Sequence, residues 1–233
     1  MKISSLTVFV FVIQAAYSNQ AAPDPCCTAE QFQISFGGTV AQSIDDRPES
    51  IQEFFNGAFD FKSQRYGLDV YIHNYTDGTD MRYKVYQLIN KGVEYIVLNS
   101  QCTEVPLQLP PSRCVPDSAT YVTSFWLGDQ ALYLDDWKVK GSSAGFVGEV
   151  YSTTASKDCT PGPMNAVGTM DVQGQKVKFM SQGTYMNFTN SISDPDYWFV
   201  PPASCSNATQ QVSESWVQPL HTLRRLRATN FFL

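Results

Sequence analysis

Apolar and polar residues alternate along much of the chain with a period of two, which is typical of half-buried β-strands. The clearest run spans residues 66–73, where every second residue from Tyr66 to Ile72 is apolar. The turn sequence Thr76-Asp77-Gly78-Thr79 follows, and Asp-Gly between two such runs is a strong hairpin signal. The pattern therefore predicts a strand, a tight turn and a returning strand over residues 81–89.

The rest of the chain repeats this strand-and-turn pattern, whereas helix signals are weak. Residues 106–116 contain four prolines, and because proline cannot donate to a β-ladder they predict an irregular loop. The best helix candidate covers residues 208–217. We predict about ten strands, the others being residues 31–39, 93–98, 121–127, 131–139, 145–153, 164–172 and 176–188, with a last tight turn at Gln173-Gly174.

The first residues have the layout of a secretory signal peptide. Lys2 precedes an apolar run over residues 3–13, and Ala16 and Ser18 offer small side chains for cleavage. The run ends at Gln14, short of the roughly 20 apolar residues that a membrane-spanning helix needs. We predict a signal peptide over residues 1–18, one β domain over residues 19–205, and a C-terminal tail over residues 206–233 that is helical or disordered.

Composition and charge narrow the class of protein. Aromatic residues are 13% of the chain and charged residues only 16%, which favours pleated, half-buried surfaces. The formal charge is −6, and three arginines gather in the tail (Arg224, Arg225 and Arg227), so the remaining chain is more acidic still. An acidic body argues against nucleic acid as a partner.

Six cysteines follow the predicted signal peptide: Cys26, Cys27, Cys102, Cys114, Cys159 and Cys205. An even number in an exported chain predicts three disulfides, although spacing alone cannot choose among the pairings. Adjacent Cys26 and Cys27 should reach two different partners, since a bond between neighbours strains the peptide. Three Asn-X-Thr sequons, at Asn74, Asn187 and Asn207, predict N-glycosylation at the surface.

The residues that catalysis would need are scarce. The two histidines are His73, on the polar face of a strand, and His221, in the basic tail. The sequence has no Gly-X-Ser-X-Gly elbow, no His-Glu-X-X-His and no glycine-rich phosphate loop. Acid pairs such as Asp45-Asp46 point to opposite faces of a strand, so only a glycosidase with distant carboxylates stays open. We expect a protein that is not an enzyme and has no organic cofactor.

Two kinds of binding remain. Calcium takes oxygen ligands from loops, and three acidic segments qualify without matching an EF-hand: Asp77-Gly78-Thr79-Asp80, Asp135-Asp136 and Asp194-Pro195-Asp196. Plain turn acids are the preferred interpretation, so no metal ligand is assigned. The apolar strand residues either fill a core between two sheets or line a pocket for an apolar ligand, and the filled core is favoured. The candidate pocket residues are Leu68, Val70, Ile72, Val93, Tyr95 and Val97.

Three segments together resemble the ependymin family, over most of the chain between Cys26 and Cys205. They are Gly92-Val93-Glu94-Tyr95 leading into Cys102, Lys157-Asp158-Cys159-Thr160-Pro161, and Asp194-Pro195 followed by Phe199-Val200-Pro201-Pro202-Ala203-Ser204-Cys205. The match is closer to an invertebrate ependymin-related protein than to a vertebrate one.

The resemblance implies an all-β fold of two antiparallel sheets, curved into a sandwich or half-barrel with a hydrophobic pocket, similar to bacterial lipoprotein carriers. It also implies homodimers, calcium association and a role in the extracellular matrix or cell adhesion, without catalysis. The implied disulfides are Cys102–Cys205 and a bond from Cys159 to Cys26 or Cys27, which leaves Cys114 for the other N-terminal cysteine. A vertebrate-type bridge to the C-terminus has no counterpart here.

The leading hypothesis is therefore a secreted, extracellular glycoprotein that binds a hydrophobic, lipid-like ligand. The alternative is a calcium-associated structural matrix protein of the shell or mantle type, without a working pocket.

Overall fold

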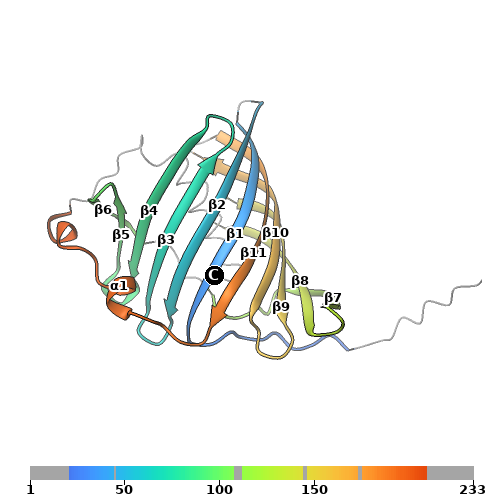
Figure 1. Ribbon diagram of the computed structural model, residues 1–233. Coiled ribbons are helices and arrows are strands. Elements are labelled where there is room, and N and C mark those ends of the chain that lie inside the picture. Colours follow the sequence, from blue (N-terminus) through green and yellow to red (C-terminus); the bar gives the residue numbers. More distant parts are fainter. Residues whose placement is uncertain (1–20, 45, 108–111, 144–145, 173–174, 209–233) are drawn as a thin grey trace, which may run out of the picture.

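The computed structural model describes residues 21–44, 46–107, 112–143, 146–172 and 175–208 (Figure 1). The predicted signal peptide, the Gln173-Gly174 turn, Asp45, most of the predicted helix at 208–217 and the tail with His221 lie outside these residues.

Eleven antiparallel strands form one sheet, in the order β6-β5-β4-β3-β2-β1-β11-β10-β9-β8-β7. Short helical turns η1 (Ile89–Lys91) and η2 (Ala203–Asn207) and the helix α1 (Pro195–Phe199) complete the described elements. The strands are β1 (Gln31–Ile44), β2 (Arg47–Asp60), β3 (Arg65–Asn74), β4 (Thr79–Leu88), β5 (Val93–Leu98), β6 (Gln101–Pro106), β7 (Thr120–Leu127), β8 (Leu132–Ser143), β9 (Phe146–Ala155), β10 (Pro161–Val172) and β11 (Gln175–Thr189).

The strand order divides the sheet into two meanders, β1–β6 and β7–β11, in which consecutive strands are neighbours. Antiparallel pairing of β1 with β11, with Phe36 opposite Tyr185, joins the two meanders. The prediction of an all-β, curved, antiparallel architecture is confirmed. The two sheets that the family resemblance implied are parts of one continuous sheet. Strand β1 joins them, because it is hydrogen-bonded to β2 on one side and to β11 on the other. Strands β6 and β7 end the sheet, which bends into an open half-barrel (Figure 1).

Strand alternation gives the sheet a buried and an exposed face. On β1, Phe32, Ile34 and Phe36 are buried and point to what we call the inner face, the concave side of the half-barrel. The opposite, outer face exposes apolar side chains such as Phe54 on β2 and Met180 on β11. Since no second sheet lies over the inner face in the described part of the chain, curvature of the sheet upon itself accounts for this burial.

Two large apolar clusters fill the inner face. The first draws on β1 to β6 and includes Phe32, Phe55 and Val70, while the second draws on β8 to β11 and includes Phe146 and Met170. Met164 of β10 packs against both clusters. One core therefore runs through both meanders and holds the half-barrel in its bent shape.

Two strands differ from the prediction. β2 was not predicted, and neither was β6, which ends where the predicted proline-rich loop begins. Pro106 lies at the end of β6, an edge strand, where a missing N–H donor is tolerated.

The short helix α1 covers the outer face over β3 and β4 and reaches Ala58 of β2. The Asp194 side chain accepts a hydrogen bond from the Tyr197 N–H and so begins the helix. Trp198 and Phe199 are buried against Ala58. Gly67 of β3 permits this approach, because a Cβ at that position would lie 2.2 Å from the Trp198 carbonyl oxygen.

Candidate ligand-binding site

The inner face between β3 and β5 is apolar apart from the Gln87–Glu94 pair. Register places Leu68 opposite Val85, which in turn lies opposite Ile96. Val70, Val85 and Ile96 are buried in the first cluster. Leu68, Met81 and Leu98 pack against that cluster but remain partly exposed, and we call these three residues the inner strip. Here an apolar surface on the concave side stays within reach of a ligand.

The six predicted pocket residues do not share one face. Leu68, Val70 and Ile72 point to the inner face, where Val70 and Ile72 are 0% and 3% exposed and belong to the filled core. Val93, Tyr95 and Val97 alternate with inner-facing Ile96 and therefore point to the outer face. The predicted set thus divides into two buried core residues, one inner-strip residue, and three residues on the opposite face.

Strand β5 carries one acidic residue on its otherwise apolar inner face. Glu94 points inward and is only 2% exposed, and its carboxylate accepts a hydrogen bond of 2.9 Å from the Gln87 side-chain amide. The pair satisfies part of the hydrogen-bonding need of a carboxylate buried among apolar side chains. Since Ile96 and Leu98 also point inward while Val93, Tyr95 and Val97 point outward, apolar residues occupy both faces of this strand.

A second candidate surface is a shallow hollow of about 740 Å³ on the outer face, over β1, β2, β10 and β11. Gly37 leaves its floor open, and the ring of Phe54 lies beside that glycine. Its polar lining is uncharged and includes the amides of Gln52, Asn165 and Gln182. An adjoining hollow of about 290 Å³ shares Phe54 and Met186 and reaches the sequon residue Asn187.

A polar network fastens α1 to the sheet beside these hollows. Arg82 and Tyr197 donate hydrogen bonds of 2.9 and 3.0 Å to the Asp69 carboxylate. Burial raises the pKa of Asp69, but the hydrogen bonds from Arg82 and Tyr197 and the nearby positive charges outweigh it, so the pKa is lowered. The Lys84 ammonium lies 3.1 Å from the centre of the Tyr197 ring. These contacts hold α1 against the sheet, which accounts for the cluster of charged residues at this position.

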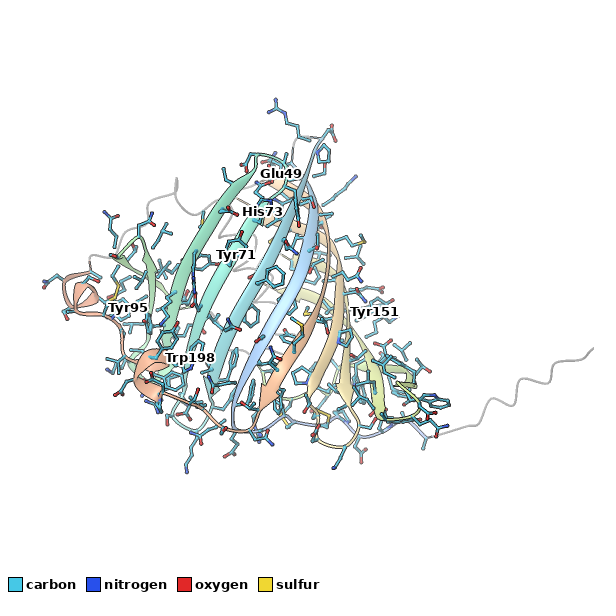
Figure 2. The ribbon with its side chains drawn as sticks, in the orientation of Figure 1. Glu49, Tyr71, His73, Tyr95, Tyr151 and Trp198 are labelled. Carbon is cyan, nitrogen blue, oxygen red and sulfur yellow. A yellow bond between two sulfur atoms is a disulfide. The ribbon has the colours of Figure 1, made fainter. Side chains whose placement is uncertain are left out.

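His73 belongs to another surface network on the outer face, above Trp198 in Figure 2. Its Nδ1 lies 2.8 Å from the Asp80 carboxylate, which also accepts a 2.6 Å hydrogen bond from the Tyr71 hydroxyl. The hydrogen bond from Tyr71, followed by that from His73, lowers the pKa of Asp80. The network links β3 to β4 across neighbouring positions of the hairpin.

Four of the acids considered for calcium, Asp77, Asp80, Asp135 and Asp194, accept hydrogen bonds from protein groups. Asp77 accepts hydrogen bonds from the backbone and hydroxyl of Thr79, and Asp135 accepts one from Ser124. Burial raises the pKa of Asp136 above its ordinary value. Among the residues that the structure describes, no group of three or more His, Cys, Asp and Glu side chains could hold a metal ion.

The disulfides are Cys26–Cys159, Cys27–Cys114 and Cys102–Cys205, and no cysteine is free. These pairings agree with those that the family resemblance implied, and adjacent Cys26 and Cys27 reach different partners. Three disulfides fit an oxidising compartment. Of the sequon residues, Asn187 and Asn207 are exposed, and Asn74 is half-buried at the end of β3.

The fold and its disulfides define an all-β protein built on one open, strongly curved antiparallel sheet. The family model described as Ependymin matches residues 77–205, more than half of the chain. The chain therefore belongs to the ependymin family. A search of curated proteins finds no match.

Three solved structures share parts of this architecture. An uncharacterised conserved protein from Thermus thermophilus is 11% identical, with 78% of this chain and 91% of that one covered and a TM-score of 0.46. A protein from Desulfovibrio piger is 8% identical, with coverages of 74% and 90% and a TM-score of 0.33. A putative outer membrane lipoprotein-sorting protein domain from Vibrio parahaemolyticus is 4% identical, with coverages of 71% and 88% and a TM-score of 0.31. Similarities this low carry no functional argument.

No helix within the described ranges is long and apolar enough to cross a membrane.

Proposed function

We propose that this protein is a secreted carrier that binds an apolar, lipid-like ligand on the inner face of the half-barrel. One observation supports it most directly: the inner strip keeps three apolar side chains partly exposed beside a packed core, on the concave side of the sheet. Apolar surface on a concave wall is the usual setting for small-molecule binding. Membership of the ependymin family agrees with this assignment.

The proposed role is binding without catalysis. His73 and Asp80 form a surface pair that is bonded to Tyr71, and the Asp69 cluster is occupied in holding α1. Both groups lie on the outer face, away from the inner strip. The side chains around the inner strip are chiefly apolar and provide contact area with few reactive groups.

Native mass spectrometry of the protein purified from an animal-cell host tests the proposal directly. Gentle denaturation should release a lipid or fatty acid at about one molecule per chain. Binding of a fluorescent fatty acid to the delipidated protein then measures affinity. A protein that carries only glycans and takes up no fatty acid would contradict the carrier function.

Two neighbouring residues of β5 offer a matched pair of variants. Leu98 belongs to the inner strip, whereas Val97 points to the outer face opposite Lys84. Leu98→Gln should weaken fatty-acid binding by about tenfold, since it removes apolar contact area from the ligand surface. Val97→Gln places the same polar side chain on the other face and should leave binding unchanged. Equal effects from the two variants would locate the ligand away from the inner strip.

Glycosylation and homodimer formation belong to the same proposal. The exposure of Asn187 and Asn207 supports N-glycans at these positions, and a glycosidase that lowers the mass would test them. Light scattering of the secreted protein tests the homodimer.

The alternative function is a calcium-associated structural component of the extracellular matrix. The net negative charge of the chain supports this role, because calcium takes carboxylate ligands. A rise in melting temperature with millimolar calcium, together with an empty protein in native mass spectrometry, would support it.

A further inference from the structure

The hairpin of β7 and β8 divides its aromatic residues between the core and solvent. Trp137 is only 2% exposed, and the Tyr121 ring packs edge-on against it at 5.7 Å. Near the turn, in contrast, Trp126 is 56% exposed and its stacked partner Tyr133 is 38% exposed. The aromatic residues at the base of the hairpin are therefore part of the core. Packing within the fold does not account for the exposed aromatic residues near the turn.

The exposed end lies beyond the ladder that holds β8 to its other neighbour. Pairing of β8 with β9 begins at Leu134, whereas the hairpin continues through the pairs Trp126–Tyr133 and Leu127–Leu132. Neighbouring pairs point to opposite faces of a hairpin. All four side chains are nevertheless exposed, so both faces are uncovered. We call Trp126, Leu127, Leu132 and Tyr133 the hairpin tip.

Charge is nearly absent from the hairpin itself near its turn. Between Tyr121 and Leu134 the one charged residue is Asp129, in the turn. Exposed large apolar residues in a segment with so little charge are costly in water and indicate a surface that is covered during function. Tryptophan and tyrosine, which join an apolar body to a polar group, are the residues enriched where lipid meets water.

We propose that the hairpin tip inserts into the surface of an uncharged lipid membrane. A protein partner is disfavoured by size, since four side chains on a protruding tip fall far short of the roughly 20–30 residues per side of a standard interface. Zwitterionic lipid fits the charge, because an acidic protein with Asp129 at its tip would be repelled by an anionic surface. As in other peripheral membrane proteins, the strength of reversible binding would depend on the apolar area that the inserted side chains bury in the lipid.

The tip gives the proposed carrier a way to reach the membrane from which an apolar ligand is taken or to which it is delivered. This role in ligand exchange rests on the proposed function. Vesicle binding can nevertheless be measured on the delipidated protein without any ligand, so the two proposals can fail separately.

The test uses the full secreted protein and phosphatidylcholine vesicles in a sedimentation assay. Wild-type protein should sediment with the vesicles, and Trp126→Ser/Leu132→Ser should bind about tenfold less or weaker still, because it removes apolar area from both faces of the tip. The control is Val147→Ser/Val167→Ser, which changes two equally exposed residues on the outer face (61% and 50% exposed) and should bind as wild type does.

Fluorescence provides a readout that does not depend on a destabilising change. Brominated phosphatidylcholine should quench part of the wild-type tryptophan emission, and Trp126→Phe should bind equally well but lose that quenching. Wild-type protein that stays in the supernatant, or quenching that persists in Trp126→Phe, would overturn the proposal. So would a halved mass of Trp126→Ser/Leu132→Ser in light scattering, since the tip would then be an interface between two copies.

Fatty-acid binding in lipid-free buffer separates this proposal from the carrier function. The double serine variant should bind the fluorescent fatty acid as wild type does. If this variant loses vesicle binding but keeps fatty-acid binding, the membrane contact lies at the tip. If wild-type protein sediments with vesicles but binds no fatty acid, the carrier function is rejected and the membrane contact is retained.

Discussion

The hairpin of β3 and β4 and the hairpin of β7 and β8 are built alike but are covered differently. Both are antiparallel pairs with a glycine in the turn, Gly78 in the first and Gly128 in the second. Away from its turn, the first is packed on the inner face by the core and on the outer face by α1, while residues 75–80 around the turn are exposed. The second is packed only at its base, and its tip is uncovered on both faces.

The difference shows that aromatic content does not decide which part of a strand is buried. Trp137 and Trp126 belong to the same hairpin, yet one fills a core cluster and the other lies in solvent. What differs is the presence of a neighbour: Trp137 lies opposite Ser152 of β9, while Trp126 lies beyond the β9 ladder. Burial of a strand residue depends on the next strand and the next layer.

The largest expected effect comes from removing the disulfide at the covered end. Cys102–Cys205 ties the segment after α1 to the edge strand β6. Cys102→Ser/Cys205→Ser should lower the free energy of unfolding by about 2–5 kcal/mol, because the bridge closes a long loop. Urea titration followed by circular dichroism measures the loss. An unchanged midpoint would mean that packing alone holds α1 in place.

A single methyl group should also disturb this end. At Gly67 a new Cβ would meet the Trp198 carbonyl, so Gly67→Ala forces α1 away from the sheet at a cost of about 3 kcal/mol. The matched change in the uncovered hairpin is Gly128→Ala, where no atom lies within 4 Å of the new Cβ. It should cost only about 1 kcal/mol, because its φ of 52° is unfavourable for alanine. Equal losses in thermal unfolding would remove the distinction between the two hairpins.

Asp60 makes the stability of the covered end depend on pH. Its buried carboxylate accepts hydrogen bonds from Ser63 and from Arg65, whose guanidinium lies over the Phe199 ring. Burial raises the pKa of Asp60, but these hydrogen bonds outweigh it and the pKa is lowered. The stabilisation is therefore present above the unfolded-state pKa of about 4 and is lost as pH falls through the lower pKa of the folded protein.

Asp60→Asn should consequently destabilise the protein at pH 7 by about 2 kcal/mol. The gap between wild type and variant should begin to narrow below pH of about 4, where the unfolded chain takes up a proton, and should narrow further as pH falls through the lower pKa of the folded protein. Urea unfolding at a series of pH values provides the measurement. A gap that stays constant down to pH of about 2 would assign the loss to packing and not to the charge.

The smallest effect is expected at the hairpin tip. Trp126→Ser removes a side chain that is 56% exposed and stacks on Tyr133, so the free energy of unfolding should change by no more than about 0.5 kcal/mol. Thermal unfolding of the variant measures it. A loss above about 1 kcal/mol would show that the tip is packed in the protein in solution.

Sequence periodicity predicted most strands because their two faces differ in polarity. Strand β2 was missed for a physical reason: Phe54 and Phe55 are consecutive, one exposed and one buried, while Glu53 points to the inner face. This sequence interrupts the alternation that identifies a half-buried strand. Pairing with β1 and β3 on either side gives β2 its structure, and the polarity pattern within β2 alone does not indicate that pairing.

The candidate pocket was harder to predict because alternation identifies two faces without saying which one is inside. On β3 the predicted pocket residues point inward, whereas on β5 the predicted residues Val93, Tyr95 and Val97 point outward. The inward position of Glu94 depends on Gln87 from the neighbouring strand. Sequence could thus indicate an apolar face on each strand, but the shared inner strip of Leu68, Met81 and Leu98 required the register between strands.

The pairing of β1 with β11 also has a consequence for how the chain folds. Each meander consists of neighbours in sequence and can form early, whereas Phe36 must wait for Tyr185, which leaves the ribosome much later. During that interval β1 presents an open strand edge with Phe32, Ile34 and Phe36 beside it. Such an edge favours aggregation. Pairing of β1 with β11 should therefore be the slow step of folding. The yield of folded protein should depend on chaperones that occupy β1 until β11 has been synthesised.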